Sequence, residues 1–294
     1  MNDQAQKLRE IVKSREIIRG ESRVNFQTRH TTLQRCKTLA VTSGKGGVGK
    51  STISLVLSAS LSALNKRVLL LDADLGLANV HILTGIAPKK TLSHVVSGEC
   101  ELEDIVLKGP CAVDIIPGAS GLEDLANIDA ARLEKLRHDF LNLESRYDYM
   151  VTDTGAGIGS TVIQFASNAD KVILVMSADP TSLADAYAMV KVLYERGNRE
   201  IAVLVNMVGS DREGIETFDR LNALVIKFLK TPVELIGVLL NDGEVRKNIR
   251  AQRMPLALKS RNRFFLRTAA LGRKISGVKT VQGKTSFFSK LLGA

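Results

Sequence analysis

The stretch KTLAVTSGKGGVGKST, residues 37–52, runs from a short apolar segment through a glycine-rich loop into a helical pattern. The spacing Gly44-x-x-x-x-Gly49-Lys50-Ser51 between a strand and a helix predicts a phosphate-binding loop. The glycines allow successive backbone N–H groups to face a phosphate, and the helix N-terminus adds partial positive charge. We expect Lys50 to meet the β and γ phosphates and Ser51 to offer its hydroxyl to Mg²⁺. A glycine-rich turn without a ligand is the alternative.

The rest of the chain repeats the alternation of apolar runs with helical patterns. Continuous apolar runs are typical of strands buried on both faces, so the pattern predicts an α/β fold with a mostly parallel sheet flanked by helices on both faces. No linker interrupts it, which favours one domain over residues 37–275, with separate segments at 1–36 and 276–294. The expected strands are residues 37–43, 67–73, 112–118, 149–154, 171–177, 201–206 and 234–240.

Composition narrows the class of protein. Apolar residues make up 45% of the 294 residues and there is no Trp, which suits an aliphatic core. The three cysteines form no C-x-x-C pair, so neither a disulfide framework nor a zinc or iron–sulfur site is expected. No apolar run is long enough to span a bilayer, and the amino terminus is polar where a secretory signal would be apolar. We expect a cytoplasmic protein.

The basic residues are concentrated at the carboxyl end. After Glu244 the sequence contains no acid and thirteen Lys or Arg residues, so the net charge of +10 becomes −3 for everything before them (10 − 13). A basic segment of this kind points to an anionic partner, either a membrane surface or nucleic acid. A solvated basic face without a partner is the alternative.

Acidic residues end two of the expected strands, at the sheet edge where α/β proteins bind ligands. Asp153 closes an apolar run and is followed by a glycine-containing loop, so its carboxylate could hold a metal-bound water. Asp72 and Asp74 end another run, in LLLDADLGLANVHIL. One of them could align a water for attack on a phosphate, although a solvated pair that caps a loop is the alternative.

A second lysine, Lys45, stands at the front of the glycine-rich loop. Lys50 already serves the terminal phosphates, so another ammonium is redundant unless it reaches a different site. If two subunits face each other across their nucleotides, Lys45 can neutralise charge in the partner's site, as an arginine finger does. An exposed loop lysine without a task is the alternative.

Several segments of the sequence resemble those of a known protein family. KGGVGKST after an apolar strand is similar to the deviant Walker A loop of the MinD/ParA ATPases, and the segments at residues 72–85, 153–158, 179–193 and 204–208 are similar to its FlhG branch of flagellar-number regulators. The resemblance covers nearly the whole chain. It implies an Mg²⁺-dependent ATPase that forms an ATP-sandwiched homodimer, sits peripherally on the membrane in the ATP state and acts with flagellar switch (C-ring) proteins.

The resemblance also implies roles for individual residues. Lys45 acts in trans and Asp74 positions the attacking water, while Asn206 reads the adenine by donating to and accepting from its edge. Where the family commonly has a proline near the base, this chain has LLNDGEV at residues 239–245. The expected catalytic residues are Lys45, Lys50 and Asp74; the nucleotide-binding residues are Gly44, Gly46, Gly47, Val48, Gly49, Lys50, Ser51, Thr52, Asp72 and Asn206; the metal-site residues are Ser51 and Asp153.

Both ends of the chain have amphipathic patterns. DQAQKLR, from Asp3 through Arg9, resembles the element by which the FlhG branch stimulates its partner GTPase FlhF, and Ala5, Leu8 and Val12 share one helical face. A short helix on a polar tether suits a partner's groove, and packing against its own body is the alternative.

At the other end, TSFFSKLLGA at residues 285–294 resembles the membrane-targeting helix of the family. Its apolar residues are expected on one face, for an anionic membrane surface, and a final helix packed on the body is the alternative. The apolar face consists of Phe287, Phe288, Leu291 and Leu292.

Two other functions share this fold. A partition ATPase of the ParA type would use the basic tail on nonspecific DNA, but the aromatic pair near the terminus argues against it, and no specific nucleic acid is expected. A metabolic ligase or kinase would need a pocket for a small acceptor, and the sequence has no obvious residues for one. We therefore expect a slow ATPase whose dimerisation works as a spatial switch.

Overall fold

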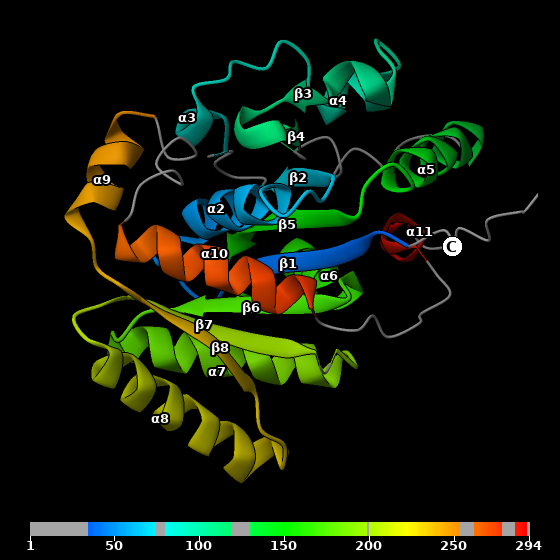
Figure 1. Ribbon diagram of the computed structural model, residues 1–294. Coiled ribbons are helices and arrows are strands. Elements are labelled where there is room, and N and C mark those ends of the chain that lie inside the picture. The colour runs from blue at the N-terminus through cyan, green and yellow to red at the C-terminus, as the bar shows by residue number, and fades with distance from the viewer. Residues whose placement is uncertain are drawn as a thin grey trace, which may run out of the picture. The chain divides into compact units, whose positions relative to one another are not determined.

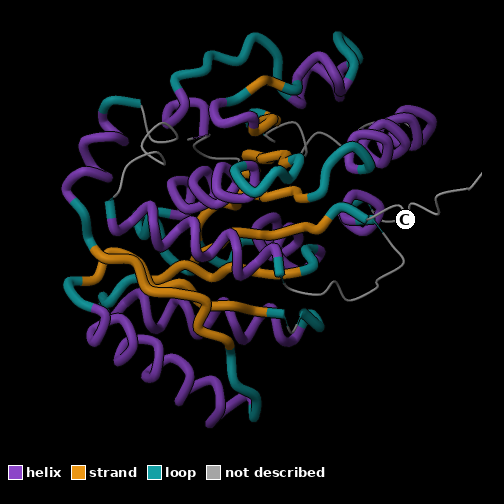
Figure 2. The backbone as a smooth tube through the Cα atoms, viewed as in Figure 1, coloured by secondary structure: helices purple, strands orange, loops and turns teal. Residues whose placement is uncertain are grey.

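A computed structural model describes residues 35–74, 80–118, 130–198, 200–252, 262–277 and 286–292, all within one compact unit. Its centre is an eight-stranded sheet with strand order β3-β4-β2-β5-β1-β6-β7-β8, parallel except for the pairing of β3 with β4 (Figure 2). The strands are β1 (Lys37–Ser43), β2 (Val68–Ala73), β3 (Leu107–Lys108), β4 (Val113–Ile116), β5 (Tyr149–Ala156), β6 (Lys171–Met176), β7 (Ile201–Val208) and β8 (Glu234–Leu240).

The sequence prediction of a mostly parallel sheet is confirmed, and all seven expected strands are present. β1 lies between β5 and β6, and its apolar run is buried almost throughout because helices cover both faces. β3 was not expected from the sequence. It is a two-residue antiparallel edge strand, too short to produce a recognisable apolar run.

Helices cover the two faces of the sheet unequally (Figure 1). On one face α2 and α10 pack side by side, and Gly272 allows this approach because a Cβ there would lie 2.9 Å from Ser60 Cβ. The other face is covered by α5, α6, α7 and α8. The helices are α2 (Lys50–Ser62), α3 (Val80–Thr84), α4 (Leu92–Ser97), α5 (Ala130–Glu144), α6 (Ser160–Asn168), α7 (Pro180–Glu195), α8 (Asp211–Leu229), α9 (Gly243–Arg250), α10 (Arg263–Ser276) and α11 (Phe287–Leu291), with short 3₁₀ turns at Leu102–Ile105 and Pro110–Ala112.

The short helix α11 docks between α5 and α6 (Figure 1). Phe287 and Phe288 are both 0% exposed, and the Phe288 ring stacks on Phe140 of α5 with 3.9 Å between centroids. Phe287 packs against Phe165 of α6. The aromatic side chains expected on a membrane surface are therefore covered by the protein's own body in this state, which matches the alternative expectation of a packed final helix.

Polar side chains hold both ends of α11. Glu144, at the end of α5, accepts from the Ser286 hydroxyl at 2.5 Å and from the Phe287 backbone N–H at 3.4 Å. At the other end, Gln164 of α6 donates to the Leu291 carbonyl at 3.0 Å, and Arg137 of α5 donates to the Leu292 carbonyl. These contacts satisfy backbone groups that helix ends leave unpaired. Among the described residues, no helix is long and apolar enough to cross a membrane.

Candidate nucleotide site

The glycine-rich loop connects β1 to α2 in the expected place. Gly47 and Gly49 adopt positive φ angles of 81° and 93°, a conformation that favours glycine. Gly49 also allows a close approach, because a Cβ there would lie 2.6 Å from Asn206 Nδ2. Lys50 is buried at the start of α2, and burial lowers the pKa of its ammonium, while the charges of Asp153 and Asp74 act in the opposite direction. The loop thus carries a desolvated cation between carboxylates.

Asp153 lies fully buried in β5, in direct register with Val41 of β1. Ser54 of α2 donates to its Oδ1 at 2.9 Å, while Oδ2 has no hydrogen-bond partner among the described residues. Burial raises the pKa of Asp153 to about 6, against the lowering effects of the neighbouring Ser51 and Ser54 hydroxyls and of Lys50. A buried carboxylate oxygen without a donor beside a serine hydroxyl is a donor set that a hydrated magnesium ion fits.

Asp72 pairs in register with Asp153 on the adjacent strand, and its side chain is 0% exposed. It accepts from the backbone N–H of Asp74 at 3.3 Å and from that of Val80 at 3.1 Å, so it ties the end of β2 to the start of α3. Burial, followed by the charge of Asp153, raises the pKa of Asp72 to about 7. Through these contacts Asp72 supports the backbone that leads to Asp74.

Asp74 lies at the same edge of the sheet. A Cβ on Gly155 would lie 3.7 Å from Asp74 Oδ1, so this carboxylate faces the last residues of β5. Its negative charge also acts on Lys50, where it partly offsets the lowering of the pKa that burial causes. The structure therefore brings together Lys50, Asp72, Asp74 and Asp153, and the roles expected of them stay predictions.

Lys45 lies apart from this group. Its ammonium donates to Asp179 Oδ2 at 2.9 Å and to Thr181 Oγ1 at 2.6 Å, at the N-terminus of α7. Hydrogen bonding from Lys45, followed by that from Thr181, lowers the pKa of Asp179 to about 2. Asp179 is also the N-cap of α7 and accepts from the Thr181 backbone N–H at 2.8 Å. The extra lysine is therefore held within its own chain, on a helix cap.

A hollow of about 170 Å³ lies beside the loop, where β7, β8 and α9 meet. Thr52 and Asn206 line it, and Asn206 Nδ2 donates to the Val48 carbonyl at 2.8 Å. This bond uses one of the two amide hydrogens, and the amide oxygen can accept from the exocyclic amine of adenine. The adenine contact expected of Asn206 stays a prediction. The segment without the family's proline supplies the opposite wall, through Leu240, Asn241, Asp242 and Val245.

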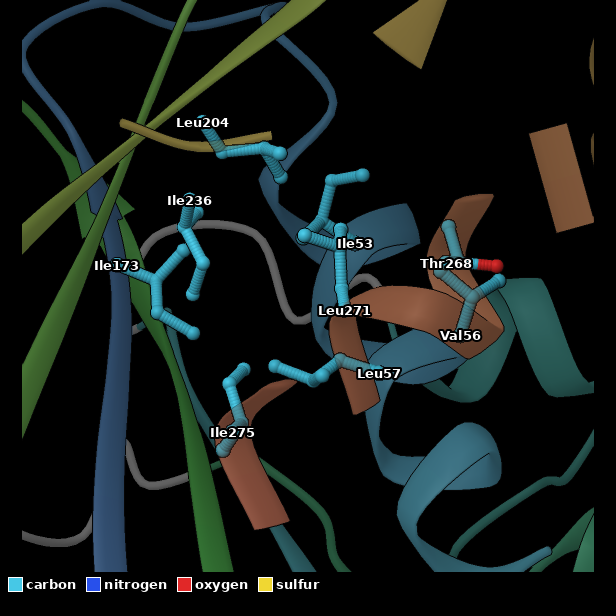
Figure 3. A pocket seen from close by; sticks show the side chains of 9 residues that line it. All are labelled: Ile53, Val56, Leu57, Ile173, Leu204, Ile236, Thr268, Leu271 and Ile275. Carbon is cyan, nitrogen blue, oxygen red and sulfur yellow. The ribbon is translucent and has the colours of Figure 1, made fainter. Parts of the chain in front are cut away.

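A second cavity, between α2, α10 and the sheet, carries no such chemistry (Figure 3). Its volume is about 10 Å³ and its lining is aliphatic except for Thr268, whose hydroxyl donates to the Phe265 carbonyl at 3.0 Å. A space of that size with no unpaired polar group barely accommodates one water. We assign it to imperfect core packing.

Sequence reasoning missed three contributors to the site: Ser54, Asp179 and Thr181. Ser54 lies on the first turn of α2 after the motif and reads as an ordinary core position. The DP pair at residues 179–180 was a usable signal, because Asp before Pro is typical of a helix start. Nothing in the sequence indicated that Lys45 would reach it.

Comparisons with known proteins agree with this geometry. A family model described as an AAA domain matches residues 36–203. The chain is 41% identical over 238 residues to the antiactivator FleN of Pseudomonas aeruginosa, covering 81% of this chain and 85% of that relative. It is 33% identical over 264 residues to the flagellum site-determining protein YlxH of Helicobacter pylori, covering 87% and 90%.

Solved structures give the same fold. The septum site-determining protein MinD of Pyrococcus horikoshii, complexed with Mg-ADP, has a TM-score of 0.66 at 24% identity and covers 82% of this chain and 96% of that chain. MinD in the MinC:MinD complex of Aquifex aeolicus has a TM-score of 0.66, also at 24% identity, over 85% of this chain and 100% of that chain. At this identity the likeness concerns the fold alone.

Proposed function

The chain belongs to the MinD/ParA family of P-loop ATPases, in the branch of FleN and YlxH, and from that premise we propose that it is a dimerising switch that regulates the number or placement of flagella. ATP hydrolysis follows from the family. The regulatory role is supported by the names of two relatives, an antiactivator and a flagellum site-determining protein. In this proposal, ATP hydrolysis at the edge of the sheet that carries the glycine-rich loop and the carboxylates sets how long the switch stays on. Release of α11 is the change that the switch produces.

For hydrolysis, we assign the phosphates to the glycine-rich loop and Lys50, and Mg²⁺ to Ser51 with Asp153 beyond its water shell. Bound Mg²⁺ would neutralise charge on the phosphates during their transfer. Asp74 accepts a proton from, and so orients, the attacking water. Asp72 keeps Asp74 in place through its bond to the Asp74 backbone N–H. Asn206 then selects adenine with its free amide oxygen.

The observation that carries the dimer is the position of Lys45. Lys50 is buried in the loop, whereas Lys45 is partly exposed and held by Asp179 and Thr181 outside the carboxylate cluster. An exposed ion pair of this kind contributes roughly 0 to 1 kcal/mol, so a triphosphate presented by a second copy can displace it. In the ATP form Lys45 leaves α7 and neutralises charge in the partner's site.

The docked helix α11 is the part of the molecule that would attach it to a membrane. Full burial of its four apolar side chains would be worth a gross gain of roughly 6 to 12 kcal/mol. The groove buries Phe287, Phe288 and Leu291 and covers Leu292 in part. Because both environments bury the same face, a modest change in the groove can shift α11 from one to the other. Two released tails on one dimer would strengthen membrane attachment by about 10² to 10⁴ through effective concentration.

Helix α6 is the physical connection between the two regions. It begins just after the glycine loop that follows Asp153, and it provides Phe165 and Gln164 to the tail groove. We assign the change to this helix: a γ-phosphate and a partner subunit at the loop displace α6, and the groove loses its grip on α11. Hydrolysis then returns monomers with docked tails.

Partners at the amino terminus complete the proposal. Residues 3–9 would stimulate the GTPase FlhF, and C-ring proteins would be carried by the body of the dimer. The FlhF segment lies outside the described residues. A peptide of residues 1–20 tests it directly: we expect the peptide to raise GTP hydrolysis by FlhF, and an unchanged rate would remove this assignment.

The dimer is tested by sedimentation velocity with ATP in an Asp74→Ala background, which slows hydrolysis. We expect dimers with ATP, monomers with ADP, and monomers in both cases when Lys45→Ala is added. Lys191→Ala, an exposed lysine on α7, is the matched control and should dimerise normally. Dimers that form equally well without Lys45 would contradict the proposal. Liposome sedimentation of the same proteins, with Phe288→Glu added, should show lipid binding only for ATP dimers with an intact tail.

A further inference from the structure

We propose that Arg246 and Met207 are base-holding residues that clamp the two faces of the nucleotide's purine, a role the sequence motifs do not assign. The inference rests on the nucleotide site of the proposed function and concerns how the chain holds a base without the family's proline. Both residues line the hollow beside the glycine-rich loop, together with Thr52 and Asn206. Met207 comes from the end of β7 and Arg246 from α9, so they approach from different elements.

Met207 occupies an unusual backbone position. Its φ is +59°, a left-handed value that L residues rarely adopt, and the pairing of β7 with β8 shifts its register between Val205 and Val208. This irregularity turns Asn206 inward and leaves Met207 43% exposed at the rim of the hollow. Strain and exposure of an apolar side chain both cost free energy, and such outliers cluster at ligand clamps. A thioether packs well against an aromatic ring.

Arg246 lines the same hollow and comes from α9. Its Nη2 donates to Asn241 Oδ1 at 3.0 Å, and within the described residues it has no carboxylate partner. The base of α9 is fixed, because Asp242 caps the helix through the Glu244 N–H at 2.7 Å and accepts from Asn262 Nδ2 at 2.8 Å. One nitrogen of the guanidinium is therefore held by Asn241, just before a fixed helix. Such a group stacks on aromatic rings.

The chemistry that fits between these two residues is a purine. A polarizable sulfur on one side and a planar cation on the other both gain from a wide π face, while the Asn206 oxygen accepts from an exocyclic amine at its edge. A pyrimidine offers less ring surface to the same pair. Stacking by this clamp would explain how the base is held where the segment at residues 239–245 departs from the family.

Isothermal titration with ADP and Mg²⁺ tests the clamp on the full chain. We expect Arg246→Ala to weaken ADP binding about 5- to 30-fold, Arg246→Lys to lose part of that, and the preference for ADP over CDP to shrink in both. Arg250→Ala changes an arginine of the same helix outside the hollow and should stay within about twofold of the unaltered chain. Tripolyphosphate, which has no base, should bind equally to all.

Three results would overturn the inference. Arg246→Ala that binds ADP as well as the Arg250→Ala control would show that the guanidinium does not hold the base. An equal loss for tripolyphosphate would move Arg246 to the phosphates. An unchanged ratio of ADP to CDP affinity would remove the stacking argument. An unaltered chain that binds no ADP would instead overturn the nucleotide site itself, so the two failures are distinguishable.

Discussion

The nucleotide edge and the tail groove are built in opposite ways. At the nucleotide edge, Asp153 Oδ2 has no donor in the part of the chain that the structure describes, and burial disfavours the charged forms of Lys50 and Asp72. In the groove, side chains of α5 and α6 cap both ends of α11, and its aromatic rings are fully buried. One region is arranged for a ligand that comes and goes, and the other is filled by the chain itself.

This contrast indicates where a ligand can change the state of the molecule. A site with unsatisfied charges gains most when a charged ligand binds, because the ligand supplies the missing partners. A groove occupied by a short helix gains nothing further from the chain and can only lose its occupant. Events at the first region can therefore change the second, provided that α6 connects them.

The largest effect is expected from removing the buried cation. Lys50→Ala should lower kcat/KM for ATP by about 10² to 10³, the scale for losing a preorganised charge at a transferring phosphate. Steady-state phosphate release measures it, and Lys191→Ala should leave the rate within about twofold. The docked tail should be unaffected, because α11 touches none of these groups. If the Lys50→Ala protein hydrolyses ATP at the normal rate, Lys50 and its loop do not take part in hydrolysis.

The next largest effect is expected in the dependence of stability on pH, which should arise from the buried carboxylates of the nucleotide site. The pKa of Asp153 is raised to about 6 and that of Asp72 to about 7, above an ordinary value of about 4 for the unfolded chain. The folded state therefore binds more protons between these values, and the nucleotide-free protein should lose stability as pH rises from about 4 to 7. Urea unfolding measures the loss, which we expect to be several kcal/mol, at about 1.4 kcal/mol for each unit by which a pKa is raised. Asp153→Asn should flatten the slope, and a slope equally steep in that variant would contradict the assignment.

The role of the groove can be tested with a substitution that leaves the tail sequence intact. Glu144→Gln removes the charge that accepts from Ser286 and Phe287, and losing charge-assisted bonds of this kind should favour the undocked tail about 5- to 30-fold. Liposome sedimentation in ADP should then show binding that the unaltered chain lacks. Glu195→Gln, an exposed residue on α7, is the control. If Glu144→Gln with ADP stays in the supernatant, Glu144 does not hold the tail.

The smallest effect is expected at the Lys45 contact. Asp179→Asn keeps an N-cap on α7 but removes the ion pair, so less ATP should be needed to form dimers, by about 2- to 5-fold. Sedimentation across an ATP titration measures the shift, with Glu216→Gln on α8 as the control. A requirement for more ATP would mean that Asp179 assists the dimer instead of restraining Lys45.

Much of the fold was predictable, because strands buried on both faces form continuous apolar runs and the phosphate loop fixes the edge that binds the ligand. The carboxylate cluster followed from the same rule, since Asp72 lies at the end of β2, Asp74 follows that strand directly and Asp153 lies three residues before the end of β5. The Lys45–Asp179 contact was not predictable. It joins residues far apart in the chain, and it depends on β6 lying next to β1.

The tail shows a different limit. An amphipathic face is the same pattern whether it meets lipid or a groove, so the sequence could not distinguish the two and left both open. The groove itself is assembled from α5 and α6, and its capping residues Glu144, Arg137 and Gln164 have no motif. Only the packing of three separate helices reveals that the chain provides its own cover for Phe287 and Phe288.

Hydrogen exchange of the α11 backbone in Asp74→Ala protein, compared between saturating ADP and saturating ATP, is the most direct test of the coupling between the two regions. The account predicts protected amides at residues 287–291 with ADP and rapid exchange with ATP, and restored protection when Lys45→Ala prevents pairing. Equal protection in both nucleotides, under conditions where sedimentation shows ATP dimers, would contradict it.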